Sequence, residues 1–304
     1  SPPIEQILHD ASMQVLIAAA KFRPDLVVVT AMMGFHPEAL VHLREFGFKT
    51  ALVLTECPYD DLEAVKVAPL FDLVFANDLA SVPSLRTVNQ ATFYLPTGYN
   101  SALHTPDGPL ADTDPNVDIL FVGTGFPERQ TFIESAMRDP VWPQHASCAF
   151  YGFWGWKEAE ESAGRVFTTD AQSPMKPYIH SAITNDETAA RYRGAKVVLN
   201  FYRDGSGYSM NPRAYEIAAC GAFQLAQDSV QEAHEVFGDT IAYFRTPHEL
   251  AQALARYLGT KYKDIHARLW LAKESRERIL TAGTYTRRAA AVAEISSHLE
   301  PVAD

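Results

Sequence analysis

The amino-acid sequence predicts an α/β protein with two halves, each built around a parallel sheet, and a helical tail. Short apolar and β-branched runs alternate with amphipathic helical stretches along most of the chain. A segment dense in proline and glycine, between Pro96 and Asn116, interrupts this alternation, and the pattern from Tyr262 to His298 is only helical. Strands that alternate with helices at this spacing form βαβ units, whose strands are parallel.

The first half opens on a helical stretch and then alternates strands with helices. Gly47 marks the end of the second helix. Because this half holds only about four strands and does not begin with one, we expect a reduced N-terminal domain over residues 1–100. Its expected helices cover residues 4–22, 37–46 and 60–70, and its expected strands cover residues 27–30, 51–55, 73–76 and 91–95.

The alternation restarts after the proline-rich segment, which is the best position for a domain border. We expect a second domain over residues 101–280 and a helical tail over residues 281–304. The expected strands of the second domain cover residues 118–122, 148–151, 197–199, 222–226 and 241–244, and its expected helices cover residues 127–137, 187–193, 212–220 and 247–258.

Composition limits the class of protein. The chain has 304 residues with 37 acidic and 26 basic side chains, and its net charge of −11 argues against a general nucleic-acid or anionic-membrane binder. The three cysteines are far apart in the sequence, which is not a disulfide or zinc pattern. No apolar run reaches the roughly 18–20 residues of a membrane span, and no secretion signal opens the chain. We therefore expect a cytoplasmic protein.

Several chemistries lack their motif in this sequence. There is no phosphate-binding Gly-x-x-x-x-Gly-Lys-Ser/Thr loop and no Gly-x-Ser-x-Gly nucleophile turn. Neither His-Glu-x-x-His nor Cys-x-x-Cys occurs, so we expect no protein-built metal site. The run from Gly123 to Glu128 begins like a dinucleotide fingerprint, but Glu128 stands where the third glycine belongs.

Two segments of the second half carry chemical content. In the first, a strand leads into Gly123-Thr124-Gly125 and then into a helix that carries Arg129 in its first turn. Backbone N–H groups at such a helix start can approach a phosphate, and the arginine adds positive charge. A plain turn between a strand and a helix, with no ligand, is an equally good interpretation of this segment.

The second segment is a glycine-bearing loop that opens a helix. Asn211 is a candidate N-cap, Pro212 fits the first helical position, and Arg213 then lies at the positive end of the helix. Glu216 follows three residues later on the same face, where a carboxylate suits the two neighbouring hydroxyls of a ribose. The alternative is a capping arrangement in which Glu216 reaches back to the helix start.

This helix resembles the signature of the CgeB-like (spore maturation protein) glycosyltransferases, which reads roughly Arg-x-Phe/Tyr-Glu-x-x-Ala-Cys-Gly. The residues that fit it in order are Arg213, Tyr215, Glu216, Ala219, Cys220 and Gly221. Other stretches are similar to the same family in the same order, namely residues 94–100, 121–129, 151–156, 195–200 and the C-terminal Thr-Tyr-x-x-Arg at 284–288. The resemblance therefore extends along most of the chain.

The resemblance implies the GT-B fold, in which two Rossmann-like domains face each other across a cleft and the final helix crosses back onto the first domain. It implies that Arg213 and the Gly123 loop hold the diphosphate of a nucleotide-sugar and that Glu216 binds its ribose. In retaining enzymes of this class a second glutamate stands where this chain has Tyr208. The donor-binding candidates are Gly123, Thr124, Gly125, Arg129, Tyr151, Gly152, Trp154, Asn200, Tyr208, Ser209, Met210, Asn211, Arg213 and Glu216.

The first domain is expected to supply the acceptor contacts and any general base, because the carboxyl ends of parallel strands face the crevice of such sheets. The catalytic candidates at these ends are His36, Glu56 and Asp60. A carboxylate there could deprotonate an acceptor hydroxyl, although Asp60 is also typical of a helix N-terminus. Trp154 and Trp156 could stack on the nucleobase or belong to the core.

We therefore expect a metal-independent glycosyltransferase that moves a sugar from a nucleotide-sugar, by family analogy a UDP-sugar, and needs no further cofactor. The resemblance favours a retaining reaction. The acceptor stays open between a protein, a glycan, a metabolite and a modified DNA base. Two alternatives remain, a catalytically idle sugar-nucleotide-binding or scaffold protein and a sugar-nucleotide epimerase on the same fold.

Overall fold

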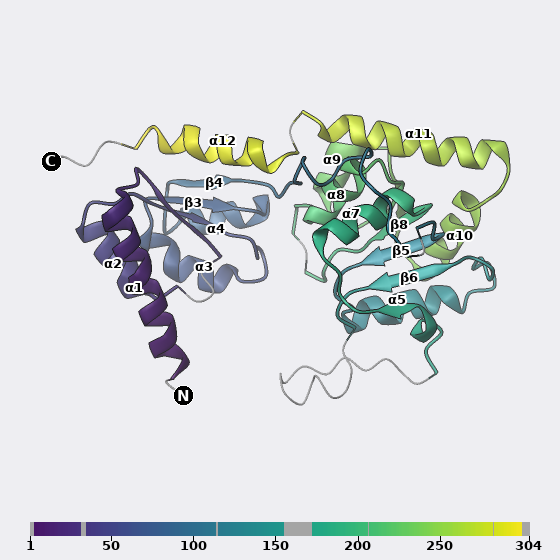
Figure 1. The fold of residues 1–304 in the computed structure, drawn as a ribbon, viewed down its shortest axis with the longest axis horizontal. Helices are drawn as coiled ribbons and strands as arrows, with labels where there is room; N and C mark the ends of the chain where they lie inside the picture. The colour runs from purple at the N-terminus through teal and green to yellow at the C-terminus, as the bar shows by residue number, and fades with distance from the viewer. Residues whose placement is uncertain are drawn as a thin grey trace. The chain divides into compact units, whose positions relative to one another are not determined.

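The computed structural model describes residues 3–31, 35–113, 115–154, 172–205, 207–281 and 283–299. The chain forms two units, and each is an α/β body with one parallel sheet, as the sequence predicts (Figure 1). Unit 1 comprises Ser1–Thr97, Asp204–Ser209 and Thr286–Asp304, and unit 2 comprises Gly98–Arg203 and Met210–Tyr285.

Unit 1 has a four-stranded sheet in the order β1-β2-β3-β4. Its strands are β1 (Val27–Thr30), β2 (Thr50–Val53), β3 (Leu73–Ala76) and β4 (Thr92–Tyr94), and its helices are α1 (Ile4–Phe22), α2 (Pro37–Glu45), α3 (Asp61–Val67), α4 (Val82–Arg86) and α12 (Tyr285–Ser296). In the register of the sheet, Leu52 lies opposite Val74, and Phe75 lies opposite Phe93. The strands fall where the sequence predicts them, with slightly shifted ends.

Alternate strand residues of unit 1 face opposite sides of the sheet. Leu52 and Val74 belong to a buried core with Leu40 of α2. Phe75 belongs to the core on the other face, where Ile295 of α12 packs. The predicted helical tail therefore covers one face of the unit 1 sheet (Figure 1).

Residues 60–70 do not form one continuous α-helix, which corrects the sequence expectation. The helix α3 ends at Val67, and Ala68–Leu70 form a 3-10 turn. Pro69 explains the break, because proline has no N–H donor with which to continue the hydrogen bonds of the α-helix. The short helix α4 was not predicted, since five residues are too few to show a helical period.

Unit 2 has a six-stranded sheet in the order β10-β9-β8-β5-β6-β7. Its strands are β5 (Ile119–Val122), β6 (Cys148–Tyr151), β7 (Ile179–His180), β8 (Val197–Asn200), β9 (Gln224–Gln227) and β10 (Ala242–Phe244), and its helices are α5 (Pro127–Met137), α7 (Asn185–Gly194), α8 (Pro212–Ala219), α9 (Gln231–Phe237), α10 (Pro247–Tyr257) and α11 (Tyr262–Ile279). The edge strand β7 was not predicted, because its two residues show no alternation.

Helices cover both faces of the unit 2 sheet (Figure 1). Phe121 of β5 packs into the core formed with α5, α10 and α11, whereas its neighbour Leu120 packs into the core on the opposite face, with Tyr192 of α7 and Ile217 of α8. Burial on both faces explains why the central strands are continuous apolar runs in the sequence.

Candidate functional site

The strand order of unit 2 reverses between β5 and β8. From β5 the chain continues outward to β6 and β7, then returns to β8 on the other side of β5 and continues to β9 and β10. Open α/β sheets bind ligands outside the carboxyl ends of the strands at such a reversal. The predicted donor residues Gly123, Gly152 and Asn200 lie at the carboxyl ends of β5, β6 and β8, so the topology places them at this edge.

Two glycines let the loops after β5 and β6 approach each other closely. Gly123 and Gly152 have φ values of +153° and +144°, which side chains rarely tolerate. A Cβ atom added to Gly152 would lie 2.0 Å from the carbonyl oxygen of Gly123. A Cβ atom added to Gly123 would lie 2.2 Å from Nη2 of Arg213. Because both positions are glycine, the backbone of Gly123 is not covered by a side chain and lies next to the guanidinium of Arg213.

Arg213 joins the ends of β5 and β8. Its Nε donates a hydrogen bond to the carbonyl oxygen of Val122 at 2.7 Å, and its Nη1 donates to Oδ1 of Asn200 at 3.2 Å and to the carbonyl oxygen of Phe201 at 3.1 Å. These acceptors are neutral, so the bonds fix the position of the guanidinium without cancelling its charge. The result is a positive group held across the reversal point.

Asn211 caps the helix α8, as predicted. Its Oδ1 accepts a hydrogen bond from the N–H of Ala214 at 3.1 Å, and its Nδ2 donates to Oδ1 of the fully buried Asn200 at 3.0 Å. Pro212 occupies the first helical position. The alternative, in which Glu216 caps the helix, is not what the structure shows. The start of α8 is thus tied to the end of β8.

Glu216 lies one turn after Arg213, and its side chain is 23% exposed. Burial raises the pKa of this carboxyl, while Arg213 acts in the opposite direction. Nε2 of His104 lies 4.0 Å from Oε1 of Glu216, and burial lowers the pKa of this imidazole. His104 was not predicted, because no local sequence pattern links residue 104 to residue 216.

Three predicted donor residues, Arg129, Trp154 and Tyr151, are buried. The guanidinium of Arg129 is buried and donates hydrogen bonds to the carbonyl oxygens of Thr124 and Tyr202. Trp154 is 1% exposed, and its ring fills the space that a side chain on Gly125 would occupy. Of the two roles considered for Trp154, its buried position agrees with a place in the core. Trp156 lies outside the described residues. The buried ring of Tyr151 stacks on His180 at 4.6 Å between ring centroids.

The segment before α8 belongs to unit 1, where the carboxylate of Asp78 anchors it. Oδ1 of Asp78 accepts a hydrogen bond from the N–H of Tyr208 at 3.2 Å, and Oδ2 accepts from the N–H of Ser209 at 3.0 Å. The hydroxyl of Ser209 lies 2.9 Å from that of Tyr94. The next residue, Met210, donates its N–H to the buried Glu232 of unit 2 at 2.6 Å. Sequence reasoning missed both anchoring carboxylates.

Unit 1 holds a cavity of about 350 Å³ at the carboxyl ends of β1 and β2. Glu56 and Asp60, two of the three predicted catalytic residues, line it. His36 does not line this cavity; it is the N-cap of α2, and its Nδ1 accepts a hydrogen bond from the N–H of Glu38 at 3.3 Å. The catalytic assignment of all three residues stays a prediction.

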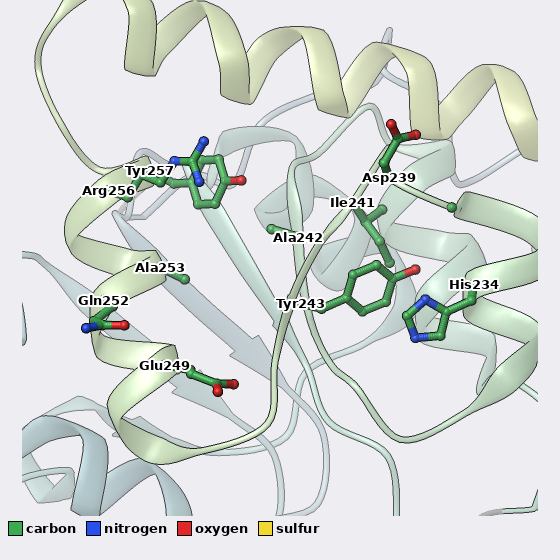
Figure 2. A pocket seen from close by; sticks show the side chains of 11 residues that line it. His234, Asp239, Ile241, Ala242, Tyr243, Glu249, Gln252, Ala253, Arg256 and Tyr257 are labelled. Carbon is green, nitrogen blue, oxygen red and sulfur yellow. The ribbon is translucent and has the colours of Figure 1, made fainter.

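Figure 2 shows a further pocket, of about 630 Å³, along the edge strand β10 of unit 2. The rings of His234 and Tyr243 stack at 4.4 Å on one side, and Gln252 and Arg256 of α10 lie on the other (Figure 2). None of the predicted donor or acceptor residues lines this pocket. This pocket is therefore separate from the predicted donor and acceptor residues.

In the described part of the chain, no three or more His, Cys, Asp or Glu side chains lie together in a way that could hold a metal ion. Within the same ranges, no helix combines the length and the apolar character that crossing a membrane requires.

The fold matches that of solved structures along nearly the whole chain. Sucrose-phosphate synthase from Thermosynechococcus elongatus is 17% identical with a TM-score of 0.65, over 97% of this chain and 78% of that chain. An α,α-trehalose-6-phosphate synthase from Burkholderia multivorans is 18% identical with a TM-score of 0.64, over 95% and 75%. HepE from Anabaena, in complex with UDP and glucose, is 13% identical with a TM-score of 0.64, over 97% and 81%. These likenesses show the GT-B fold.

The family is shown by the sequence itself. A family model described as glycosyl transferase-like matches residues 129–294, which is more than half of the chain. The protein belongs to this family and is a glycosyltransferase. No curated protein matches the chain by sequence.

Proposed function

We propose that this glycosyltransferase takes its sugar from a nucleotide-sugar that binds at the reversal point of unit 2. The observation that carries the proposal is Arg213, whose guanidinium joins the ends of β5 and β8 beside the bare backbone of Gly123. Positive charge next to a helix N-terminus suits a diphosphate. UDP is the expected nucleotide, and the structure of HepE in complex with UDP and glucose supports this choice.

Glu216 is assigned to the ribose. It follows Arg213 on the same face of α8, one turn further from the helix start. Its carboxylate oxygens can accept hydrogen bonds from two neighbouring hydroxyls. The finer assignment to the CgeB-like family rests on the resemblance of this helix and of the other motifs, and it is part of the same proposal.

The proposed reaction needs no metal ion and no cofactor besides the nucleotide-sugar. The bond between the anomeric carbon and the diphosphate breaks, the acceptor oxygen bonds to that carbon with retained configuration, and the acceptor proton passes to the departing phosphate oxygen. Arg213 and the start of α8 offset the negative charge that develops on the diphosphate. The assignment of Glu56, Asp60 and His36 of unit 1 to the acceptor stays a prediction.

Calorimetric titration with UDP and with uridine tests the role of Arg213. Arg213→Ala should lower the affinity for UDP about 10- to 100-fold, because a charged hydrogen-bond donor to the diphosphate is lost. The affinity for uridine should stay within about twofold, since uridine has no phosphate. Arg138→Ala is the matched control. Arg138 is an exposed arginine at the C-terminal end of α5, whereas the Gly123 loop precedes the N-terminal end of this helix. Equal losses for UDP and uridine would contradict the assignment.

Release of free sugar from a UDP-sugar separates this proposal from the idle binding protein. An active enzyme hydrolyses its donor slowly when no acceptor is present, and the released sugar can be followed by NMR. A protein that binds UDP tightly but releases no sugar from any UDP-sugar, with or without candidate acceptors, would support the idle alternative.

A further inference from the structure

His104 is a buried side chain of unit 2 that lies beside the carboxylate of Glu216. It is 5% exposed, and its Nε2 lies 4.0 Å from Oε1 of Glu216. Among the described residues, His104 is the one basic side chain within 4.0 Å of this carboxylate. The guanidinium of Arg213 instead binds the carbonyl oxygens of Val122 and Phe201. His104 is therefore placed to act on Glu216 directly.

The backbone around His104 is fixed from two sides. The carbonyl oxygen of Asn100 accepts hydrogen bonds from the N–H groups of Leu103 and His104, at 3.1 and 2.8 Å. Nη1 of Arg193 on α7 donates to the carbonyl oxygens of Leu103 and Thr105, at 3.4 and 3.1 Å, and so holds the residues on both sides of His104. The imidazole is therefore held beside α8 before any ligand binds.

The surroundings of the ring decide which of its nitrogens carries the proton. Burial, and in addition the charge of Arg193, lower the pKa of the His104 imidazole, so the ring is neutral at pH 7. Nδ1 is buried and has no hydrogen-bond partner among the described residues. A proton on Nδ1 would leave a buried N–H group unpaired and would turn the lone pair of Nε2 toward the carboxylate of Glu216. A proton on Nε2 avoids both costs.

The distance between His104 and Glu216 leaves room for a hydrogen bond to form on ligand binding. At 4.0 Å the two side chains are not yet hydrogen-bonded. A rotation of the Glu216 side chain that moves its carboxylate by about 1 Å would bring Nε2 within hydrogen-bond distance. A carboxylate has about four lone-pair sites, so one bond from Nε2–H leaves enough acceptors for two hydroxyls of a ligand.

We propose that His104 is a positioning residue for Glu216 and that the pair makes the donor site select a ribonucleoside diphosphate. When the ribose is bound, Nε2–H of His104 donates to the Glu216 carboxylate, and the two ribose hydroxyls donate to its remaining lone pairs. A hydrogen bond to the charged form keeps the carboxyl ionised and fixes its orientation. This inference rests on the proposed function, because it concerns how the ribose of the same nucleotide-sugar is held.

Calorimetric titration of the full chain with UDP and with 2′,3′-dideoxy-UDP tests the inference, because the two ligands differ only in the hydroxyls assigned to Glu216. The wild-type chain should bind UDP about 30-fold more tightly than the dideoxy compound. His104→Phe keeps an aromatic ring but has no N–H donor. It should lower this preference about three- to tenfold, while the affinity for the dideoxy compound stays within about twofold.

His104→Gln tests the role of Nε2 itself, because the amide nitrogen of glutamine can take the position of Nε2. This variant should keep the preference for UDP within about twofold of wild type. In a Glu216→Gln background, His104→Phe should not lower the preference further, since the carboxylate that His104 positions is gone.

His145→Phe is the matched control. His145 is an exposed histidine that precedes β6, at the amino ends of the strands, whereas the donor site lies at their carboxyl ends. Its replacement should leave both affinities unchanged. Melting temperatures show which variants fold, and His104→Leu, which is closer to histidine in volume, replaces His104→Phe if the larger ring prevents folding.

Three results would overturn the inference: an unchanged preference in His104→Phe, equal losses of affinity for both ligands, or no greater preference in His104→Gln than in His104→Phe. The Glu216→Gln variant separates this failure from that of the proposed function. A preference that Glu216→Gln abolishes and His104→Phe leaves intact rejects only the role of His104. A wild-type chain that binds both ligands equally rejects the ribose assignment of Glu216 together with this inference, and a chain that binds neither rejects the donor site itself.

Discussion

At the scale of single residues, Glu216 combines a role in the proposed donor site with a cost to the free protein. Its carboxyl is largely buried, and this burial raises its pKa above the value it has in the unfolded chain. The folded protein therefore holds a proton on Glu216 more tightly than the unfolded chain does. Its contribution to stability is fully present below the unfolded pKa and is lost as the pH rises through the folded pKa.

Glu216→Gln should accordingly stabilise the unliganded protein at pH 8 and weaken its binding of UDP about 10-fold or more. The gain in melting temperature over wild type should shrink as the pH falls toward the unfolded pKa, because both proteins then carry a neutral side chain. Thermal unfolding between pH 5 and pH 8 measures the gain. A variant that is less stable than wild type at pH 8 would show that Glu216 is held by favourable contacts in its charged form.

At the scale of elements, the close approach of the loops after β5 and β6 requires glycine. Gly152→Ala should cost about 3–4 kcal/mol, since its positive φ strains a side chain and the added Cβ would meet the backbone of Gly123. Gly238→Ala is the control, because Gly238 also has a positive φ but its nearest neighbouring atom would be 3.9 Å away. Gly238→Ala should cost only the backbone strain, about 1–3 kcal/mol for a sparsely populated conformation.

The unfolding midpoints of these variants in urea can be followed by tryptophan fluorescence. The described tryptophans Trp142, Trp154 and Trp270 belong to unit 2, so their signal reports the unit that carries both glycines. A cost for Gly152→Ala no greater than that for Gly238→Ala would mean that the two loops do not pack as closely as described.

The sequence predicts most elements, because buried strands and amphipathic helices leave a local pattern. The strand starting at Ile119 and the helix α8 with its Asn211 cap are examples. What it misses is short or set by other parts of the chain. The strand β7 owes its conformation to pairing with β6, and its two residues are too few to show a periodic pattern. The end of α3 is different, because Pro69 is a local signal that the expected helix over residues 60–70 overlooked.

At the scale of the whole molecule, unit 1 is assembled from three separate stretches of the chain. The short stretch Asp204–Ser209 joins it through the carboxylate of Asp78, far away in the sequence. Backbone N–H groups that bind a distant carboxylate leave no signature in their own residue types. For this reason sequence reasoning placed Tyr208 and Ser209 with the donor residues and did not find their anchor.

The candidate site likewise contains residues that the sequence predicts and one that it does not. Gly123, Gly152, Asn200 and Arg213 could be predicted, since strand ends, glycine loops and a capped helix start are local features. The position of His104 beside Glu216 could not, because it depends on how the segment after Gly98 folds against α8. The assignment of these residues to a nucleotide-sugar is still a prediction.

Amide hydrogen exchange with and without saturating UDP tests the central claim most directly, because it locates the ligand without assuming a sugar or an acceptor. We predict slower exchange in peptides that cover residues 122–125, 151–154 and 211–216, and unchanged exchange in peptides 238–243 and 249–257 along the pocket of Figure 2. Protection confined to the peptides of that pocket, or no protection anywhere, would contradict a nucleotide-sugar site at the reversal point between β5 and β8.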